Sequence, residues 1–398
     1  MNGLERIART MRHQAPDRVP VMCQLSMGHY SLNGGYKPHE IWYETEAFAD
    51  ATVKLARRYR FDGILVVLPG RPEGYLDRNL VSLVENEDGQ TLTWKNGDRT
   101  FFPWDDMPHH YPVDTEKSQR ADFDIFDPQN GLDHIDEYLG HTWNVLYHMQ
   151  EIPEKENSGL FTNCPIPEYS WRMFDLVKAA AGDDLSIHGS FYSPLTHFFE
   201  LFGYENALIG FISDPGKAHA VLDRLTGHVI AYALALLQRG ADALDLSSAF
   251  VAAPFLSRKM YAEFVVPYEK RVTQAVKEAG GVVYTHTCGR IGDRLDLMEA
   301  TGTQGIDTLD PPPLGNGDLA VAKRDFGERL FFKGNMNSVA ILSYQTEAEV
   351  VAEAASRIEI GKPGAGYILS TACSVAPHVE PWKIELLTPL AEEIGRYE

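Results

Sequence analysis

Hydrophobic residues along this chain follow two alternating patterns. Short runs of mostly apolar residues, typical of buried strands, are separated by longer segments in which apolar residues return every three or four positions, typical of amphipathic helices. We predict about eight strands, over residues 17–25, 62–68, 185–191, 241–250, 281–288, 304–310, 329–337 and 366–375. We predict helices between them, over residues 38–60, 195–211, 215–239, 257–280, 290–302, 318–327 and 347–361, and a last helix near the end of the chain.

This order of elements predicts an α/β fold. Strands that alternate with helices indicate a parallel sheet, because each helix returns the chain to the same edge. About eight strands in one series predict a (β/α)8 barrel, also called a TIM barrel, and an open doubly wound sheet is the alternative. In both folds, the residues that carry chemistry gather at the carboxyl ends of the strands.

One part of the chain breaks this rhythm, after the second predicted strand. The alternating residues 80–104, with the turn EDGQ, predict a β-hairpin, and helices are predicted over residues 134–150 and 168–181. Length alone suggests two or three domains, but a single barrel with insertions reaches 398 residues. We therefore expect one barrel domain over residues 1–398, with residues 76–165 as an insertion within it.

Composition and charge narrow the classes of function. The chain has 36 Lys and Arg residues against 56 Asp and Glu residues, a formal net charge of −20. This balance argues against binding nucleic acid or an anionic membrane surface, since both need clustered positive charge. No run approaches 18 consecutive apolar residues, and the first residues lack the hydrophobic region of a signal peptide, so we expect a cytoplasmic protein.

The strongest candidate chemistry is the sequence HTCG at the end of the strand over residues 281–288. Side chains two positions apart on a strand project to the same face, so His286 and Cys288 can hold one ion together. Cys373 ends a later strand and would lie at the same edge. One imidazole and two thiolates suit zinc and leave a fourth position open. Packing in the core is the alternative, because free cysteines are often buried.

Other residues at strand ends are weaker candidates. Asp245, Asp310 and Asn335 each follow a predicted strand, where they could bind substrate or cap the next helix. Cys23 and Cys164 have no His or Cys close by in the sequence, and we expect them to be packing or loop residues. The aromatic and Gly-rich stretches MGHYSLNGGY and PGRPEGY would suit a flat aryl ring, with core tyrosines as the alternative.

Several motifs resemble the uroporphyrinogen decarboxylase superfamily, a (β/α)8 barrel, over nearly the whole chain. They are DRVPVM, GADALDLSSAF with LSRKMYAEFVVPYEKRV, and FFKGNMN. The chain departs from the decarboxylases at the positions that bind the porphyrinogen. Leu25 and His29 stand in place of two arginines, Pro69 in place of an aspartate, and Cys373 in place of a late histidine. Carboxylates need paired cations when they lose water, so we do not expect decarboxylation of uroporphyrinogen.

What remains is similar to the zinc- and corrinoid-dependent methyltransferase branch of that superfamily. The resemblance implies that His286, Cys288 and Cys373 are zinc ligands, and that His29 and Tyr30 contact substrate. It also implies methyl transfer from an O-methyl substrate, which we expect to be a methoxylated aromatic, to a corrinoid. The alternatives are a methylcobamide:thiol methyltransferase of the coenzyme M type and a non-catalytic corrinoid-binding protein.

The corrinoid is expected to arrive on another protein. The chain has no D-x-H-x-x-G motif, the loop that supplies a histidine to a bound corrinoid in other proteins. We therefore expect a separate corrinoid protein and a small-molecule methyl donor as partners, with a homodimer left open.

Overall fold

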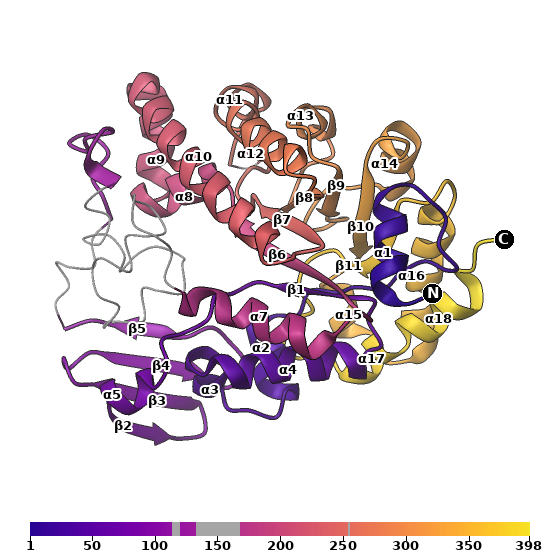
Figure 1. The fold of residues 1–398 in the computed structure, drawn as a ribbon, viewed down its shortest axis with the longest axis horizontal. Helices are drawn as coiled ribbons and strands as arrows, with labels where there is room; N and C mark the ends of the chain where they lie inside the picture. Colours follow the sequence, from indigo (N-terminus) through magenta and orange to yellow (C-terminus); the bar gives the residue numbers. More distant parts are fainter. Residues whose placement is uncertain (114–119, 133–167, 254) are drawn as a thin grey trace.

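A curled parallel sheet forms the centre of the molecule. The computed structural model describes residues 1–398 except 114–119, 133–167 and 254, which Figure 1 draws in grey. The seven strands of this sheet are hydrogen-bonded in their order along the chain, and every pair is parallel. They are β1 (Gly63–Val66), β6 (Ser186–Tyr192), β7 (Ala243–Ser247), β8 (Val283–Thr287), β9 (Gly305–Thr308), β10 (Phe331–Met336) and β11 (Tyr367–Thr371).

The predicted strand over residues 17–25 lies between the two edge strands of this sheet. Val21 pairs with Leu369 in β11, and the backbone N–H of Asp62, directly before β1, donates to the carbonyl of Val21. Pro20 has no N–H to donate, and the segment forms isolated bridges rather than a regular strand. With this segment the sheet is nearly a closed ring, which confirms the predicted (β/α)8 barrel.

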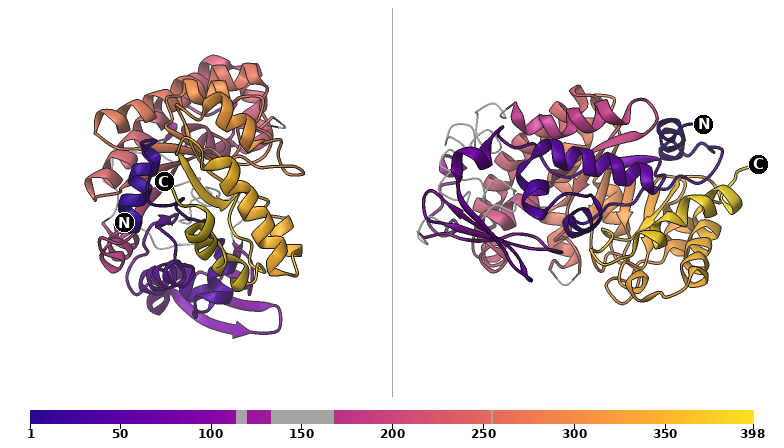
Figure 2. Two further views of the ribbon diagram at one scale, coloured as in Figure 1. Left: turned by 90° about the vertical axis from the view of Figure 1, so that its right-hand side faces the viewer. Right: turned by 90° about the horizontal axis from the view of Figure 1, so that it is seen from below.

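Helices cover the outside of the curled sheet, as Figure 2 shows. Those before β6 are α1 (Gly3–Met11), α2 (Met27–Asn33), α3 (Pro38–Tyr43), α4 (Thr45–Arg58), α5 (Tyr75–Asn79) and α7 (Tyr169–Ala181). Those after β6 are α8 (Pro194–Phe202), α9 (Tyr204–Ser213), α10 (Pro215–Gln238), α11 (Arg258–Phe264), α12 (Val266–Glu278), α13 (Leu295–Ala300), α14 (Leu319–Phe326), α15 (Ala340–Ser343), α16 (Glu347–Gly361), α17 (Pro381–Glu385) and α18 (Leu387–Ile394).

Three of the predicted helices are pairs of shorter helices. The first breaks at Glu44, whose backbone is extended, with φ −106° and ψ 104°. The second breaks at Gly203, whose φ of 78° lies in the left-handed region that glycine adopts without strain. The third breaks before Pro267, which is tolerated in the first turn of α12 but not inside a continuous helix. The periodic pattern of apolar residues continues through each break, which explains why it does not reveal the breaks.

Among the helices that the structure describes, only α10 is long and apolar enough to cross a membrane by length and composition. This helix packs against α8, α12 and β6. Its apolar residues are therefore accounted for by the helical layer of the barrel.

A second, antiparallel sheet lies between β1 and β6 in the sequence. It has the order β2 (Leu80–Glu85), β3 (Gly89–Trp94), β4 (Arg99–Pro103) and β5 (His109–Tyr111). The predicted hairpin is its first pair, and β4 and β5 extend it. Trp94 and Phe102 of this sheet pack against Trp42 and Tyr43 of α3.

The second sheet contains two histidines, and part of the sequence that follows it lies outside the described residues. His109 and His110 both belong to β5. His110 is partly buried, and its Nδ1 atom lies 3.0 Å from the Oγ1 atom of Thr100. The predicted helix over residues 134–150 and Cys164 lie outside the described residues, whereas the helix predicted over 168–181 is α7.

A buried ion-pair cluster lies at the amino-terminal ends of the strands, opposite their carboxyl ends. The Asp62 carboxylate accepts hydrogen bonds from Arg6 and from both Nη atoms of Arg18, at 2.8 and 3.0 Å. It also accepts the backbone N–H of Val21 at 2.7 Å. Asp62 thereby ties α1 and the first extended segment to the start of β1.

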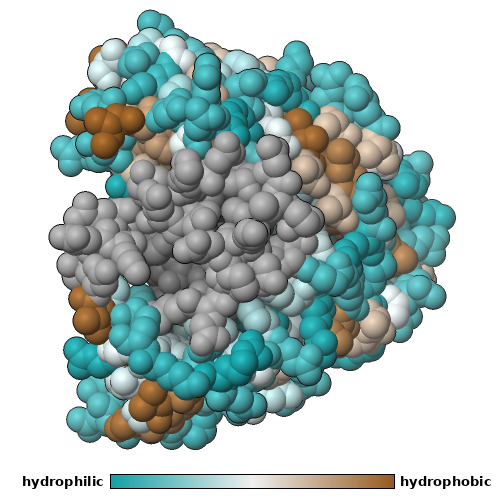
Figure 3. All heavy atoms as spheres, turned by 60° about the vertical axis from the view of Figure 1, so that its left-hand side comes forward, coloured by the Kyte–Doolittle hydropathy of each residue, from teal (hydrophilic) through white to brown (hydrophobic). Residues whose placement is uncertain are grey.

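The surface in Figure 3 is mostly hydrophilic among the coloured residues. Hydrophobic side chains occur there as small separate patches. Scattered exposed apolar residues of this kind are normal for a protein surface in contact with water.

Candidate metal centre

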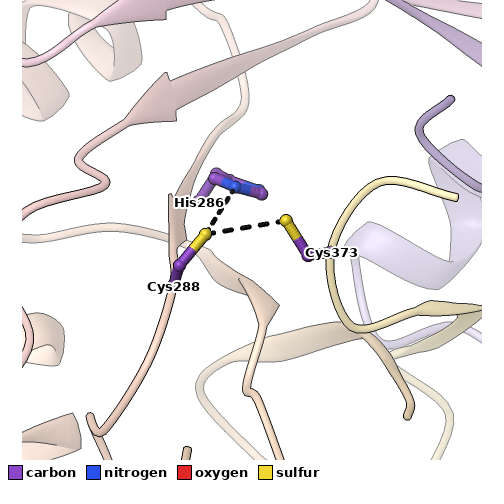
Figure 4. A group of neighbouring side chains, drawn as sticks. All are labelled: His286, Cys288 and Cys373. Atoms are coloured by element: carbon purple, nitrogen blue, oxygen red, sulfur yellow. Dashed lines mark hydrogen bonds between the residues drawn. The ribbon is translucent and has the colours of Figure 1, made fainter. Parts of the chain in front are cut away.

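Three side chains meet at the carboxyl end of the barrel. His286 lies in β8, Cys288 directly follows that strand, and Cys373 follows β11. The Sγ atom of Cys288 lies 3.5 Å from Nε2 of His286 and 3.7 Å from Sγ of Cys373. Figure 4 shows the imidazole and both sulfurs pointing toward one common point. The structure thus brings together the three residues that the sequence predicts as metal ligands.

These distances fit a shared zinc ion. A tetrahedral zinc with Zn–S bonds of about 2.3 Å and Zn–N bonds of about 2.0–2.1 Å holds two sulfurs about 3.8 Å apart. The same geometry holds a sulfur and a nitrogen about 3.5 Å apart. All three ligand atoms of the cluster lie within 4.8 Å of one another. The donor set, its spacing and its burial therefore suit zinc with one coordination position left for another ligand.

The loops that follow the strands hold the two cysteines in place. Cys373 donates its backbone N–H to Oγ of Ser338 at 2.8 Å, and its carbonyl accepts from Oγ1 of Thr371 at 2.6 Å. After Cys288 the chain turns at Gly289, whose φ is 86°. The N–H of Gly289 donates to the Asp310 carboxylate at 2.7 Å.

The imidazole of His286 is anchored on its other side by Asp307 and by Thr308, whose Oγ1 atom lies 3.1 Å from Nδ1, and the sequence prediction missed both. Oδ2 of Asp307 lies 3.0 Å from its Nδ1 atom, and both oxygens of Asp307 accept from the Lys333 ammonium at 2.9 Å. The three residues stand side by side, because β8 pairs His286 with Asp307 and β9 pairs Asp307 with Lys333. The signal in the sequence is a single charged residue inside each of two apolar strands.

The charges in this cluster depend on one another. A hydrogen bond from Cys288 holds the pKa of Cys373 well below its ordinary value and raises that of Cys288. Burial opposes a charge on His286, but the neighbouring Cys288 and Asp307 outweigh it and raise the imidazole pKa. Burial likewise opposes the charge of Asp307, but Lys333 and His286 lower its pKa. These interactions favour a thiolate at Cys373, and thiolate is the form of cysteine that binds metal.

Two of the predicted substrate residues lie beside the cluster. One oxygen of Asp245 accepts from Ser190 at 2.9 Å, and the other has no hydrogen-bond partner. Burial raises the pKa of Asp245 to about 6. Asp310 supports the turn after Cys288, and burial raises its pKa as well. Neither carboxylate caps the helix that follows its strand, which was the alternative role.

Asn335 has a different position in the structure. Its side-chain amide donates to the carbonyl of Leu309 at 2.9 Å and links β10 to the end of β9. Its Oδ1 atom is buried and has no partner. A substrate contact by Asn335, as by Asp245 and Asp310, stays a prediction.

His29 and Tyr30 lie in α2 and are buried. Nε2 of His29 lies 2.7 Å from the hydroxyl of Tyr59, and its Nδ1 atom lies 3.3 Å from the carbonyl of Ala376, in the loop that carries Cys373. Burial lowers the pKa of His29 to about 4. Tyr30 packs edge-on against Phe48, at a ring distance of 5.1 Å. Both side chains make structural contacts, and their contact with substrate stays a prediction.

Tyr75, one of the aromatic candidates, and His188 of β6 belong to the core. Tyr75, from the stretch PGRPEGY, stacks on Tyr43 at 5.4 Å in the cluster under the antiparallel sheet. His188 lies inside the barrel between the hydroxyls of Ser186 and Tyr284, at 3.0 and 2.9 Å. Core packing is therefore the role that the structure gives to both.

Comparisons with known proteins identify a family model and two kinds of related enzyme. A family model described as uroporphyrinogen decarboxylase (URO-D) matches residues 166–394. The chain is 29% identical over 188 residues to a uroporphyrinogen decarboxylase of Chlorobium phaeovibrioides, which covers 45% of this chain and 50% of that protein. It is also 29% identical over 204 residues to the methylcobamide:CoM methyltransferase MtbA of Methanosarcina acetivorans, which covers 49% of this chain and 57% of that protein.

The aligned part spans about half the length of these curated relatives. Among solved structures, a methyltransferase from Methanosarcina mazei is similar over 99% of both chains, with a TM-score of 0.66 and 16% identity. That likeness shows a shared fold, which agrees with the barrel described above.

Proposed function

Because the chain belongs to the uroporphyrinogen decarboxylase family, we propose that it is a zinc-dependent methyltransferase of that family which acts with a corrinoid. The observation that carries this proposal is the cluster of His286, Cys288 and Cys373, whose atoms have the spacing of three ligands around one zinc ion. The similarity to a methylcobamide:CoM methyltransferase supports the same reaction class. We place the protein in the cytoplasm.

The proposed reaction moves a methyl group from an oxygen atom to the corrinoid of a separate corrinoid protein. The methyl donor is an O-methyl compound, which we take to be a methoxylated aromatic. When bound, zinc supplies a Lewis acid that stabilises negative charge on the oxygen that loses the methyl group. The chain lacks the D-x-H-x-x-G motif for binding a corrinoid, which supports a corrinoid carried by a partner.

The protein's own residues have three tasks in this reaction. His286, Cys288 and Cys373 would hold the metal in a partly buried site, where electrostatic interactions are stronger than in water. The unpartnered oxygen of Asp245 is available to accept a hydrogen bond from the substrate. Asp310 keeps the turn after Cys288 in position through its bond to Gly289.

A decarboxylase reaction is not proposed, although decarboxylases are among the relatives. Leu25 and His29 stand where the decarboxylases carry arginines, according to the resemblance in sequence. In the structure, Leu25 is buried and pairs with Val375, and burial disfavours the charged form of His29. Neither residue offers a cation to a substrate carboxylate.

Transfer from a methylcobamide to a thiol is the second candidate. It is favoured by the similarity to MtbA of Methanosarcina acetivorans and would use the same three zinc ligands. Zinc in that case lowers the pKa of a thiol substrate. A non-catalytic corrinoid-binding protein is the third candidate and requires no zinc.

One spectroscopic experiment tests these candidates. The zinc-loaded protein is mixed with cob(I)alamin and a series of methoxylated aromatics, and the absorbance of methylcobalamin is followed. We expect methylcobalamin to form with the wild type but not with Cys373→Ala. A parallel reaction starts from methylcobalamin and a thiol. Consumption of methylcobalamin there, without its formation in the first reaction, would favour the second candidate, and no conversion in either reaction would favour the third.

A further inference from the structure

A buried lysine stands next to the candidate metal centre. Lys333 lies in β10 with only 2% of its surface exposed, and its ammonium lies 2.9 Å from both oxygens of Asp307. Removing a lysine and a carboxylate from water costs several kcal/mol for each ion, which is offset only when the two ions pair in good geometry. A pair this deep inside a barrel therefore needs an explanation beyond fold stability.

Asp307 connects that lysine to the metal centre. Its Oδ2 atom, which accepts from Lys333, also lies 3.0 Å from Nδ1 of His286. If Nδ1 donates to this carboxylate, the lone pair of the imidazole is on Nε2, the atom that faces Cys288 at 3.5 Å. Oγ1 of Thr308 lies 3.1 Å from the same Nδ1 atom and can accept the same N–H, so Asp307 and Thr308 favour the same tautomer, the one that can bind a metal together with the two sulfurs.

Lys333 also keeps the Asp307 carboxylate from binding a second cation. Asp245, His286 and Asp307 form a second group whose potential ligand atoms lie within 4.8 Å of one another. A carboxylate in such a group could turn toward a second cation. Because the Lys333 ammonium engages both oxygens of Asp307, it already supplies the positive charge that this group would attract.

We infer that Lys333 and Asp307 are a positioning pair that sets the zinc affinity of the centre formed by His286, Cys288 and Cys373. Lys333 compensates the buried charge of Asp307, and Asp307 orients the imidazole of His286. This inference rests on the proposed zinc centre but makes a separate claim, since three ligands could bind zinc without help from β10. Outer partners of metal-binding histidines typically contribute about 10- to 100-fold in metal affinity.

A purely structural role for the pair is the competing explanation. The pair joins β9 to β10, so its loss could weaken the barrel without any specific effect on zinc. Lys383 provides a matched control. It is 1% exposed, donates to the carbonyls of Ile341 and Leu342 at 3.0 and 3.1 Å, and pairs with Glu380, so its described partners include neither a metal ligand nor Asp307.

The test measures zinc affinity of the full-length protein by competition with a chromogenic chelator. The variants are Lys333→Met, Asp307→Asn, the double variant and the control Lys383→Met, each with a thermal melt of the metal-free protein. We expect zinc affinity to fall about 10- to 100-fold in both single variants. The double variant should bind no more weakly than Asp307→Asn, because Lys333 acts through Asp307. Lys383→Met should lose thermal stability but keep the affinity of the wild type.

A second readout reports the geometry of the site. Cobalt(II) in place of zinc absorbs visible light with an intensity that depends on its coordination, and we expect a changed spectrum in Asp307→Asn but not in Lys383→Met. Asp307→Asn keeps the side-chain volume, so it carries the test if Lys333→Met does not fold. Unchanged zinc affinity and an unchanged cobalt spectrum in Asp307→Asn would overturn the inference while leaving the zinc centre intact. A wild type that binds no zinc would overturn the centre itself, and the inference with it.

Discussion

The sulfur atoms of Cys288 and Cys373 lie 3.7 Å apart, although the two residues are 85 positions apart in the chain. They follow β8 and β11, which have β9 and β10 between them in the sheet. In a flat sheet, three strand spacings would separate these strands by about 14 Å. The curl of the barrel therefore brings together the residues of the candidate metal centre, because it turns the ends of both strands toward one point.

Loss of either sulfur should remove the metal without unfolding the chain. We predict that Cys288→Ala and Cys373→Ala bind much less zinc than the wild type and lose activity, because two remaining ligands hold zinc poorly. The fold should persist, since a barrel of this size does not depend on the ion for its core. Zinc content by elemental analysis and a circular dichroism spectrum check both points.

Cys23 serves as the control for these two variants. It is a buried free cysteine outside the cluster. Cys23→Ala should lose some stability through the cavity it leaves, yet retain its zinc. Full zinc occupancy in a Cys288→Ala, Cys373→Ala double variant would rule out the proposed ligands.

The stability of the protein should depend on the protonation of Glu269. Glu269 lies in α12, where one oxygen of its carboxyl accepts a hydrogen bond from Ser248 and the other has no partner. Burial raises the pKa of this carboxyl to about 7. The unfolded chain has the ordinary pKa of about 4.5. Since the folded state binds the proton more tightly, Glu269 contributes fully below pH 4.5, and that contribution is lost as the pH rises to about 7.

A Glu269→Gln variant separates this titration from the others in the protein. Gln cannot ionise, so the variant should match the wild type near pH 4.5 and exceed it in free energy of unfolding, by about 3 kcal/mol at most, above pH 7. Urea unfolding across that pH range gives the comparison. A constant difference between the two proteins at all pH values would show that Glu269 does not titrate in this way.

The ion-pair cluster around Asp62 should be the most sensitive charged site at the amino-terminal end of the strands. Asp62→Ala leaves the buried guanidinium of Arg18 and the N–H of Val21 without their acceptor. Breaking a buried ion pair in this way typically costs about 3–5 kcal/mol. Denaturant unfolding measures the loss. The exposed pair of Arg324 and Asp325 is the control, because Asp325→Ala should change stability little.

The protein should not decarboxylate uroporphyrinogen. By the resemblance in sequence, Leu25, His29 and Pro69 stand where the decarboxylases carry charged residues for that substrate, and none of the three supplies a charge for it. Incubation with uroporphyrinogen under anaerobic conditions, followed by chromatography, measures the product. Formation of coproporphyrinogen at an enzymatic rate would contradict this prediction.

The sequence predicts the barrel and the metal ligands for a common reason. Parallel strands buried on both faces are apolar throughout, so that a polar residue at the end of such a run is conspicuous, as His286 and Cys288 are. The rule that strand ends share one edge then adds Cys373. Neither step requires the three-dimensional structure.

The residues that support the ligands could not be found in this way. Asp307 and Lys333 lie inside apolar strands, and the sequence around each does not show which residue it pairs with. Only the register between β9 and β10 shows that the two side chains are neighbours. In the same way, the breaks at Glu44 and Gly203 depend on local backbone angles that the periodicity of apolar residues does not encode.

X-ray absorption at the zinc edge of the wild-type protein tests the central claim most directly. The account predicts two sulfur neighbours at about 2.3 Å and nitrogen or oxygen neighbours at about 2.0–2.1 Å, with one sulfur fewer in Cys373→Ala. It would be contradicted by a zinc ion surrounded only by nitrogen and oxygen, or by a wild-type protein that carries no zinc when purified in its presence.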